Sequence, residues 1–84
     1  MEEKEIGTVF LFFAKPSVAA IKLKDSLKIG DKIHIKGHTT DLTQTIDSMQ
    51  IDNKPIEKAK AGDDIGIKVN DRVRPNDLVF LVKE

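Results

Sequence analysis

The sequence predicts an all-β protein, a closed antiparallel barrel of six or seven strands. Apolar and polar residues alternate along most of the chain, which is the two-residue period of β-strands. Turn-forming residues recur about every ten residues, a spacing typical of small barrels and sandwiches. No segment with a helical period exceeds about six residues, so helices are not expected.

The expected elements follow from this alternation and from the turn residues between them. The first strand is apolar on both faces, and the strand at 43–51 needs a bulge because Ile46 and Met49 have opposite parity. Gly30 can adopt the positive φ that a tight turn requires. We expect strands at 6–14, 18–24, 32–37, 43–51, 65–69 and 78–82, turns at 15–17, 27–31, 52–55, 70–71 and 75–77, and one helical turn at 57–61.

The composition describes one small domain without strong bulk charge. The 84 residues, taken as a single domain 1–84, include no cysteine, which excludes disulfides and thiolate metal sites and fits a reducing compartment. Fourteen basic and fourteen acidic residues cancel, so the chain has no bulk attraction for nucleic acid or membrane. Residues 1–5 do not resemble a signal peptide, and the apolar run at 9–14 is far shorter than the roughly 20 residues that span a bilayer. We therefore expect a soluble, cytoplasmic protein with no membrane partner.

The alternation also predicts the core and one exposed apolar row. If Phe10 and Phe12 face the core, then Val9, Leu11 and Phe13 point outward, and such a row usually marks a protein contact. The alternative is that a turn or the loop before the last strand covers this row. The expected core consists of Ile6, Phe10, Phe12, Ile21, Leu23, Leu27, Ile33, Ile35, Met49, Ile65, Ile67, Val69, Phe80 and Val82.

A lysine-rich face is the second candidate contact surface. It forms if the strands at 18–24 and 32–37 are neighbours, and lysines bind a polyanion through its phosphates without reading bases. The alternative is an ordinary solvated face whose charge is offset by nearby aspartates. The candidate residues for binding RNA or another partner are Lys22, Lys24, Lys32, His34, Lys36 and His38.

Motifs for nucleotide binding and nucleophilic catalysis are missing. The sequence contains no Gly-x-x-x-x-Gly-Lys-Ser/Thr loop for phosphate. The segment 53–56 begins like a guanine-reading Asn-Lys-x-Asp motif, but Ile56 stands in place of the aspartate. Ser48 could join a histidine and an aspartate only on paper, because no nucleophile-elbow context surrounds it. We therefore expect no bound nucleotide and no catalytic residue.

Metal binding is not expected either. His34 and His38 share strand parity, but Gly37 lies between them and the sequence places no third ligand. Asp63 and Asp64 could bind a cation, yet they are more simply explained as turn residues that accept backbone hydrogen bonds. We therefore expect neither a metal nor another cofactor.

Several segments, in order, resemble a known family of barrels. Residues 7–9 look like its opening strand, 27–33 like its turn into a second hairpin, 45–50 like its middle strand, 59–67 like its Ala-Gly-Asp/Glu-x-Val-Gly segment and 73–82 like its last strand. This set resembles the β-barrel second domain of elongation factor Tu and other translational GTPases. Similar barrels end some larger collagenase-like peptidases and occur as free-standing elongation-factor-like proteins, and this chain looks closest to the free-standing kind.

This resemblance implies a barrel of the translation-protein type that lacks a GTPase domain. It implies a non-catalytic binding module, which would contact structured RNA or a ribosome-associated protein through the lysine-rich face. The competing hypothesis is a protein-interaction or dimerisation module that docks, for example on an enzyme, through the outward row of the first strand.

Overall fold

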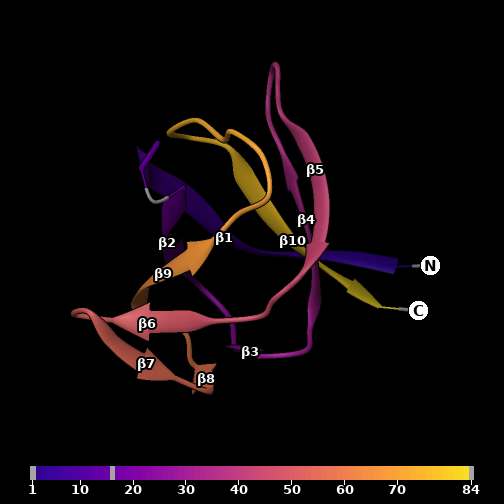
Figure 1. The fold of residues 1–84 in the computed structure, drawn as a ribbon. Helices are drawn as coiled ribbons and strands as arrows, with labels where there is room; N and C mark the ends of the chain where they lie inside the picture. The colour runs from indigo at the N-terminus through magenta and orange to yellow at the C-terminus, as the bar shows by residue number, and fades with distance from the viewer. Residues whose placement is uncertain (1, 16, 84) are drawn as a thin grey trace.

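The computed structural model describes residues 2–15 and 17–83, and this part of the chain is folded entirely from strands and turns (Figure 1). Its strands are β1 (Glu2–Phe13), β2 (Val18–Leu23), β3 (Leu27–Lys28), β4 (Lys32–Lys36), β5 (Asp41–Thr45), β6 (Met49–Ile51), β7 (Lys54–Ile56), β8 (Lys58–Ala59), β9 (Asp64–Lys68) and β10 (Leu78–Lys83). Within this part, no helix is long and apolar enough to cross a membrane. The all-β prediction is therefore confirmed.

Eight strands form one antiparallel sheet in the order β5-β4-β10-β1-β2-β9-β6-β7, and β3 pairs separately with β8. The sheet curls around a central space, with the β4–β5 hairpin rising on one side and β3 and β8 at the opposite end (Figure 1). Its hydrogen-bonded order begins at β5 and ends at β7, so the ladder among the described residues is open. The predicted closure of the barrel is therefore not found.

The side chain of Gln44 connects β5 to the end of β9 without a strand ladder. Its Nε2 donates a hydrogen bond to the backbone oxygen of Lys68 at 2.9 Å, and its Oε1 accepts one from the backbone N–H of Asn70 at 2.8 Å. Gln44 is buried, so these bonds satisfy both polar atoms of a side-chain amide that is largely shielded from water. A side chain thus links β5 to the end of β9, although these two strands are not neighbours in the sheet.

The inner face of the curled sheet holds one apolar core. Most of the predicted core residues are buried, and Phe12 packs partly buried against the cluster. Phe80 is different: it is half-buried on the outer face, where its ring centroid lies 6.3 Å from that of His34. The buried apolar side chains that the predicted core omits are Val9, Ala19, Ile46, Ala59, Val73 and Val79.

Two bulges in β1 explain the largest error in the predicted core. The register of β1 shifts against β10 between Glu5 and Gly7, and against β2 between Val9 and Leu11. Each bulge adds one residue, so the inward positions of β1 lie three residues apart, at Ile6, Val9 and Phe12. Val9 is therefore buried and Phe10 is exposed, opposite to the prediction.

Other elements differ in their bounds. β1 begins at Glu2 because the charged N-terminal residues pair with β10. The strand expected at 43–51 is divided into β5 and β6, and the expected helical turn at 57–61 is instead the short strand β8. The turn at 52–55 is tighter than expected, because Asp52 and Asn53 both have positive φ and β7 begins directly after them. Of the turn predicted at 15–17, Pro16 lies outside the described residues.

Candidate functional site

The two strands that carry the predicted lysine-rich face are not neighbours. In the sheet, β10 and β1 lie between β4 and β2, so two strands separate Lys22 from Lys32 and Lys36. Lys24 follows β2 and forms an ion pair with Glu5 of β1. The six candidate residues are thus spread across the sheet, with acidic side chains of β1 between them.

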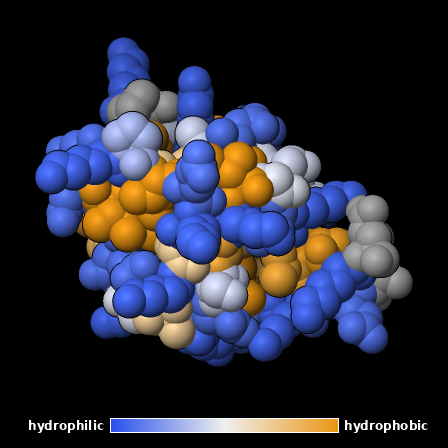
Figure 2. All heavy atoms as spheres, turned by 90° about the horizontal axis from the view of Figure 1, so that it is seen from below, coloured by the Kyte–Doolittle hydropathy of each residue, from blue (hydrophilic) through white to orange (hydrophobic). Residues whose placement is uncertain are grey.

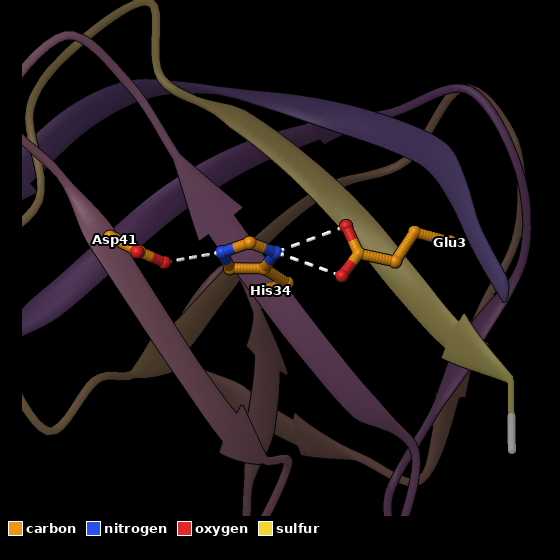
Figure 3. A network of polar contacts seen from close by, with 3 residues as sticks. All are labelled: Glu3, His34 and Asp41. Atoms are coloured by element: carbon orange, nitrogen blue, oxygen red, sulfur yellow. Dashed lines mark hydrogen bonds and ion pairs between the residues drawn. The ribbon is translucent and has the colours of Figure 1, made fainter. Parts of the chain in front are cut away.

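His34 lies between two carboxylates rather than facing solvent with the lysines. Its Nδ1 lies 3.0 Å from both carboxylate oxygens of Glu3 on β1, and its Nε2 lies 2.5 Å from Oδ1 of Asp41 on β5 (Figure 3). The side chain is 15% exposed. The hydrogen bonds to Glu3 and then to Asp41 raise the pKa of His34 above its usual range, because both favour the protonated ring. Through these contacts, His34 of β4 connects β5 with β1, which lies on the other side of β10.

The structure brings together no metal site or catalytic triad from the residues that the sequence singles out. Among residues 2–15 and 17–83, no group of three His, Cys, Asp or Glu side chains could hold a metal ion. His38 is exposed in the turn between β4 and β5, and within the same residues Ser48 forms no hydrogen bond to a histidine. Asp63 accepts a hydrogen bond from the backbone N–H of Lys60 at 3.0 Å, next to Gly62 with its φ of +94°. Asp63 thus has the structural place in a turn that the sequence indicates.

An apolar row on the outer face of β1 and β2 is the clearest candidate contact surface. Phe10, Leu11 and Phe13 are 42%, 48% and 50% exposed. In the strand register, Leu11 lies opposite Ala20 and Phe13 opposite Val18, both half-buried on the same outer face. Among residues 2–15 and 17–83, no turn or loop covers Leu11 and Phe13, and of the predicted row only Val9 is buried.

A shallow hollow of about 170 Å³ adjoins this row. Apolar side chains of β1 and β2 form one wall of the hollow. Gly66 of β9 also lines the hollow, and a Cβ atom added to this glycine would lie 3.3 Å from side-chain atoms of Val18 and Gln50. Asp52 and Asp64 also line it, and the lining includes no basic residue. The hollow thus joins apolar contact surface to a carboxylate rim.

Figure 2 shows the face of the molecule that is seen from below in the view of Figure 1. On this face, apolar surface lies in separate areas that hydrophilic side chains divide.

Sequence reasoning missed Phe10 and the hollow for the same reason. Strict alternation assigned Phe10 to the core, whereas the bulge between Val9 and Leu11 places Phe10 and Leu11 together on the outside. A signal was present: the run from Val9 to Phe13 is apolar on both parities, which an ordinary strand with one wet face does not require. That signal identifies the strand, but it does not locate the bulge.

No protein-family model matches the chain. Curated relatives do match nearly its whole length. The chain is 49% identical over 81 residues, 95% of its length, to an uncharacterized protease of Methanocaldococcus jannaschii. It is 32% identical over 77 residues, 89% of its length, to a collagenase of Porphyromonas gingivalis. The chain spans only 20% and 21% of these two proteins.

Solved structures agree with the curated relatives. Two crystal structures of the C-terminal domain of a U32 peptidase from Geobacillus thermoleovorans superpose with TM-scores of 0.85 and 0.89. They cover 90% and 95% of this chain, and this chain covers 96% and 93% of them. At 16% identity, this likeness shows the fold alone.

These comparisons overturn the function predicted from the translation-factor resemblance. The relatives are named protease and collagenase, and the superposed structures belong to a U32 peptidase, so the prediction of a translation-factor-like, RNA-binding module is wrong. The likeness to the second domain of elongation factor Tu is not confirmed, whereas the likeness to collagenase-like peptidases is. The homologues of this chain are thus collagenase-like proteins, and its fold is that of a U32 peptidase C-terminal domain.

Proposed function

We propose that this chain is a non-catalytic accessory domain that works together with a collagenase-like peptidase. The observation that supports this most directly is the 49% identity to one fifth of an archaeal protease. A segment that makes up a fifth of such a protein and folds around its own apolar core is suited to serve as one domain beside a larger part.

The surface of the chain is consistent with a binding role. The hollows among the described residues are shallow and open, and the His34, Glu3 and Asp41 side chains are satisfied by one another. The exposed apolar row, in contrast, offers contact area without reactive groups. Substrate hydrolysis in this proposal belongs to the larger part of the peptidase.

A domain replacement tests this proposal. This chain is substituted for the matched 77-residue segment of the Porphyromonas gingivalis collagenase, and gelatin hydrolysis is measured. We expect the chimera to hydrolyse gelatin, while a matched chimera carrying an unrelated β-domain of similar length loses activity. We expect this chain alone to release no peptide from gelatin.

Two results would contradict the proposal. The first is equal gelatin hydrolysis by the two chimeras, which would mean that the domain contributes nothing to the peptidase. The second is gelatin hydrolysis by this chain alone that survives repurification, which would show that the domain is itself catalytic.

A further inference from the structure

The exposed row on β1 is built into the backbone of the domain. Against β2, Val9 pairs with Ile21 and Leu11 pairs with Ala20, so Phe10 is the additional residue of the bulge. The bulge is further held by the loop before β10, because Val9 N–H donates to the oxygen of Asp77 at 2.8 Å and Asn76 N–H donates to the oxygen of Val9 at 2.7 Å. A fixed bulge therefore presents Phe10 and Leu11 side by side on the outside.

The exposed apolar area of the row indicates what kind of partner can bind it. Side chains of this kind present roughly 150–250 Å² each, so three that are about half exposed offer roughly 200–400 Å² of apolar surface. Patches of about 300–600 Å² are the largest on typical monomers and are often functional. A stable complex between separate proteins needs about 800 Å² per partner, about one seventh of the 5440 Å² of this chain. The row is too small to hold two copies of the chain together firmly.

A contact inside one polypeptide needs less area. A covalently linked neighbour is present at an effective concentration in the millimolar range, so a modest patch suffices to dock it. The relatives provide such a neighbour, because the matched segment is only 20% of the archaeal protease and 21% of the collagenase. The small apolar row therefore fits a partner that is a larger part of the same peptidase better than it fits a second copy.

From these observations, and resting on the function proposed above, we infer that the outer face formed by Phe10, Leu11, Phe13 and the adjoining hollow is the surface on which the peptidase part docks. The chemistry of the hollow specifies the contact. Its apolar wall and the glycine at position 66 accept one apolar side chain, and its rim carries Asp52 and Asp64. These two carboxylates form no ion pair within residues 2–15 and 17–83. The docking segment of the peptidase part thus presents an aromatic or aliphatic side chain flanked by lysine or arginine.

The experiment uses a chimera of the Methanocaldococcus jannaschii protease in which this chain replaces the matched 81-residue segment. Docking is measured by the rate of tryptic cleavage at the junction and by the radius of gyration from small-angle X-ray scattering. The double variant Leu11→Asp/Phe13→Asp is compared with the matched control Ile29→Asp, which places a charge on an apolar side chain of similar exposure in the turn between β3 and β4. The milder variant Phe13→Ala accompanies them, and thermal unfolding of each isolated variant chain verifies that it folds.

We expect the double variant to raise the rate of junction cleavage about tenfold or more and to increase the radius of gyration. We expect Phe13→Ala to have a smaller effect of the same sign, and Ile29→Asp to match the parent chimera. Unchanged cleavage and size in the double variant would overturn the inference, and so would a stable dimer of the isolated chain that Phe13→Asp dissociates. The gelatin assay tests the proposed function separately. A collagenase chimera that is more active than its matched control, together with an unaffected double variant, rejects this surface only, whereas equal gelatin hydrolysis by the two collagenase chimeras rejects the accessory role itself.

Discussion

Gly37 and Asp77 pack so closely that position 37 has no room for a side chain. A Cβ atom at residue 37 would lie 1.9 Å from Oδ1 of Asp77. Asp77 is buried, and its Oδ2 accepts a hydrogen bond from the backbone N–H of Arg74 at 2.8 Å. Gly37 directly follows β4 and Asp77 directly precedes β10, so this contact lies at the end of the ladder between these two strands.

Replacing this glycine tests the contact. We expect Gly37→Ala to lower the free energy of unfolding by about 1–3 kcal/mol, because the added methyl group must push Asp77 away from its hydrogen bond. Urea denaturation measures the change. In an Asp77→Ala background, the same substitution should cost much less, since the clashing carboxylate is gone. Equal losses in the two backgrounds would contradict the steric explanation.

Removing the buried Gln44 amide should also destabilise the fold. We expect Gln44→Leu to lower the free energy of unfolding by about 1–3 kcal/mol, because the part-buried backbone groups of Lys68 and Asn70 lose their hydrogen bonds to the amide. The matched control is Gln50→Leu, since the Gln50 side chain makes no hydrogen bond within the described part of the chain. This control should stay within about 0.5 kcal/mol of the parent. Similar losses in the two variants would show that Gln44 contributes only packing.

The bulge in β1 predicts opposite outcomes at positions two residues apart. Val9 is fully buried and Leu11 is half exposed. Val9→Asp would bury a charge without a partner and is expected to prevent folding. Leu11→Asp is expected to change stability by no more than about 0.5 kcal/mol. Circular dichroism with thermal unfolding distinguishes the two, and a folded Val9→Asp beside an unfolded Leu11→Asp would mean that the face of β1 is inverted.

The environment of His34 predicts how stability depends on pH. Because Glu3 and Asp41 raise the pKa of His34, the folded chain keeps the ring proton at a higher pH than the unfolded chain. The stabilisation is complete below the ordinary value of about 6.5 and is lost as the pH rises through the raised pKa. Urea denaturation across this range should therefore show a falling free energy of unfolding.

Two variants control this pH dependence. His34→Gln should remove the contribution of this group to the slope, and Glu3→Gln should reduce it, because Glu3 is the larger cause of the raised pKa. An NMR titration of His34 gives the same answer directly. If the pKa of His34 is the same in Glu3→Gln as in the parent chain, the Glu3 carboxylate is not the cause of the raised pKa.

Sequence periodicity predicted the inward residues wherever a strand is regular. Ile33 and Ile35 of β4, and Ile65 and Ile67 of β9, alternate without interruption and are all buried. The same rule failed at Phe10, because a bulge changes the parity of every residue beyond it and the doubly apolar run from Val9 to Phe13 does not show where the bulge lies. It also failed at Phe80, which is half-buried on the outer face beside the ring of His34, a residue far away in the sequence.

The candidate sites depended on strand order, which periodicity does not contain. The predicted lysine-rich face required the strands of Lys22 and Lys36 to be neighbours, yet β10 and β1 lie between these strands. β10 is the last strand of the chain, and its insertion beside β4 is a long-range pairing. Local pattern could not indicate it.

By itself, the sequence determined the class of fold, the turns at Gly30 and Asp63 and most of the buried apolar side chains, because these follow from local backbone preference and two-residue alternation. The tertiary structure alone decided the order of the strands, the open ladder with the Gln44 hydrogen bonds, the contacts of His34 with Glu3 and Asp41, and the place of Phe10 instead of Val9 in the outward row on β1. Each of these depends on contacts between residues far apart in the chain, and only folding brings such residues together.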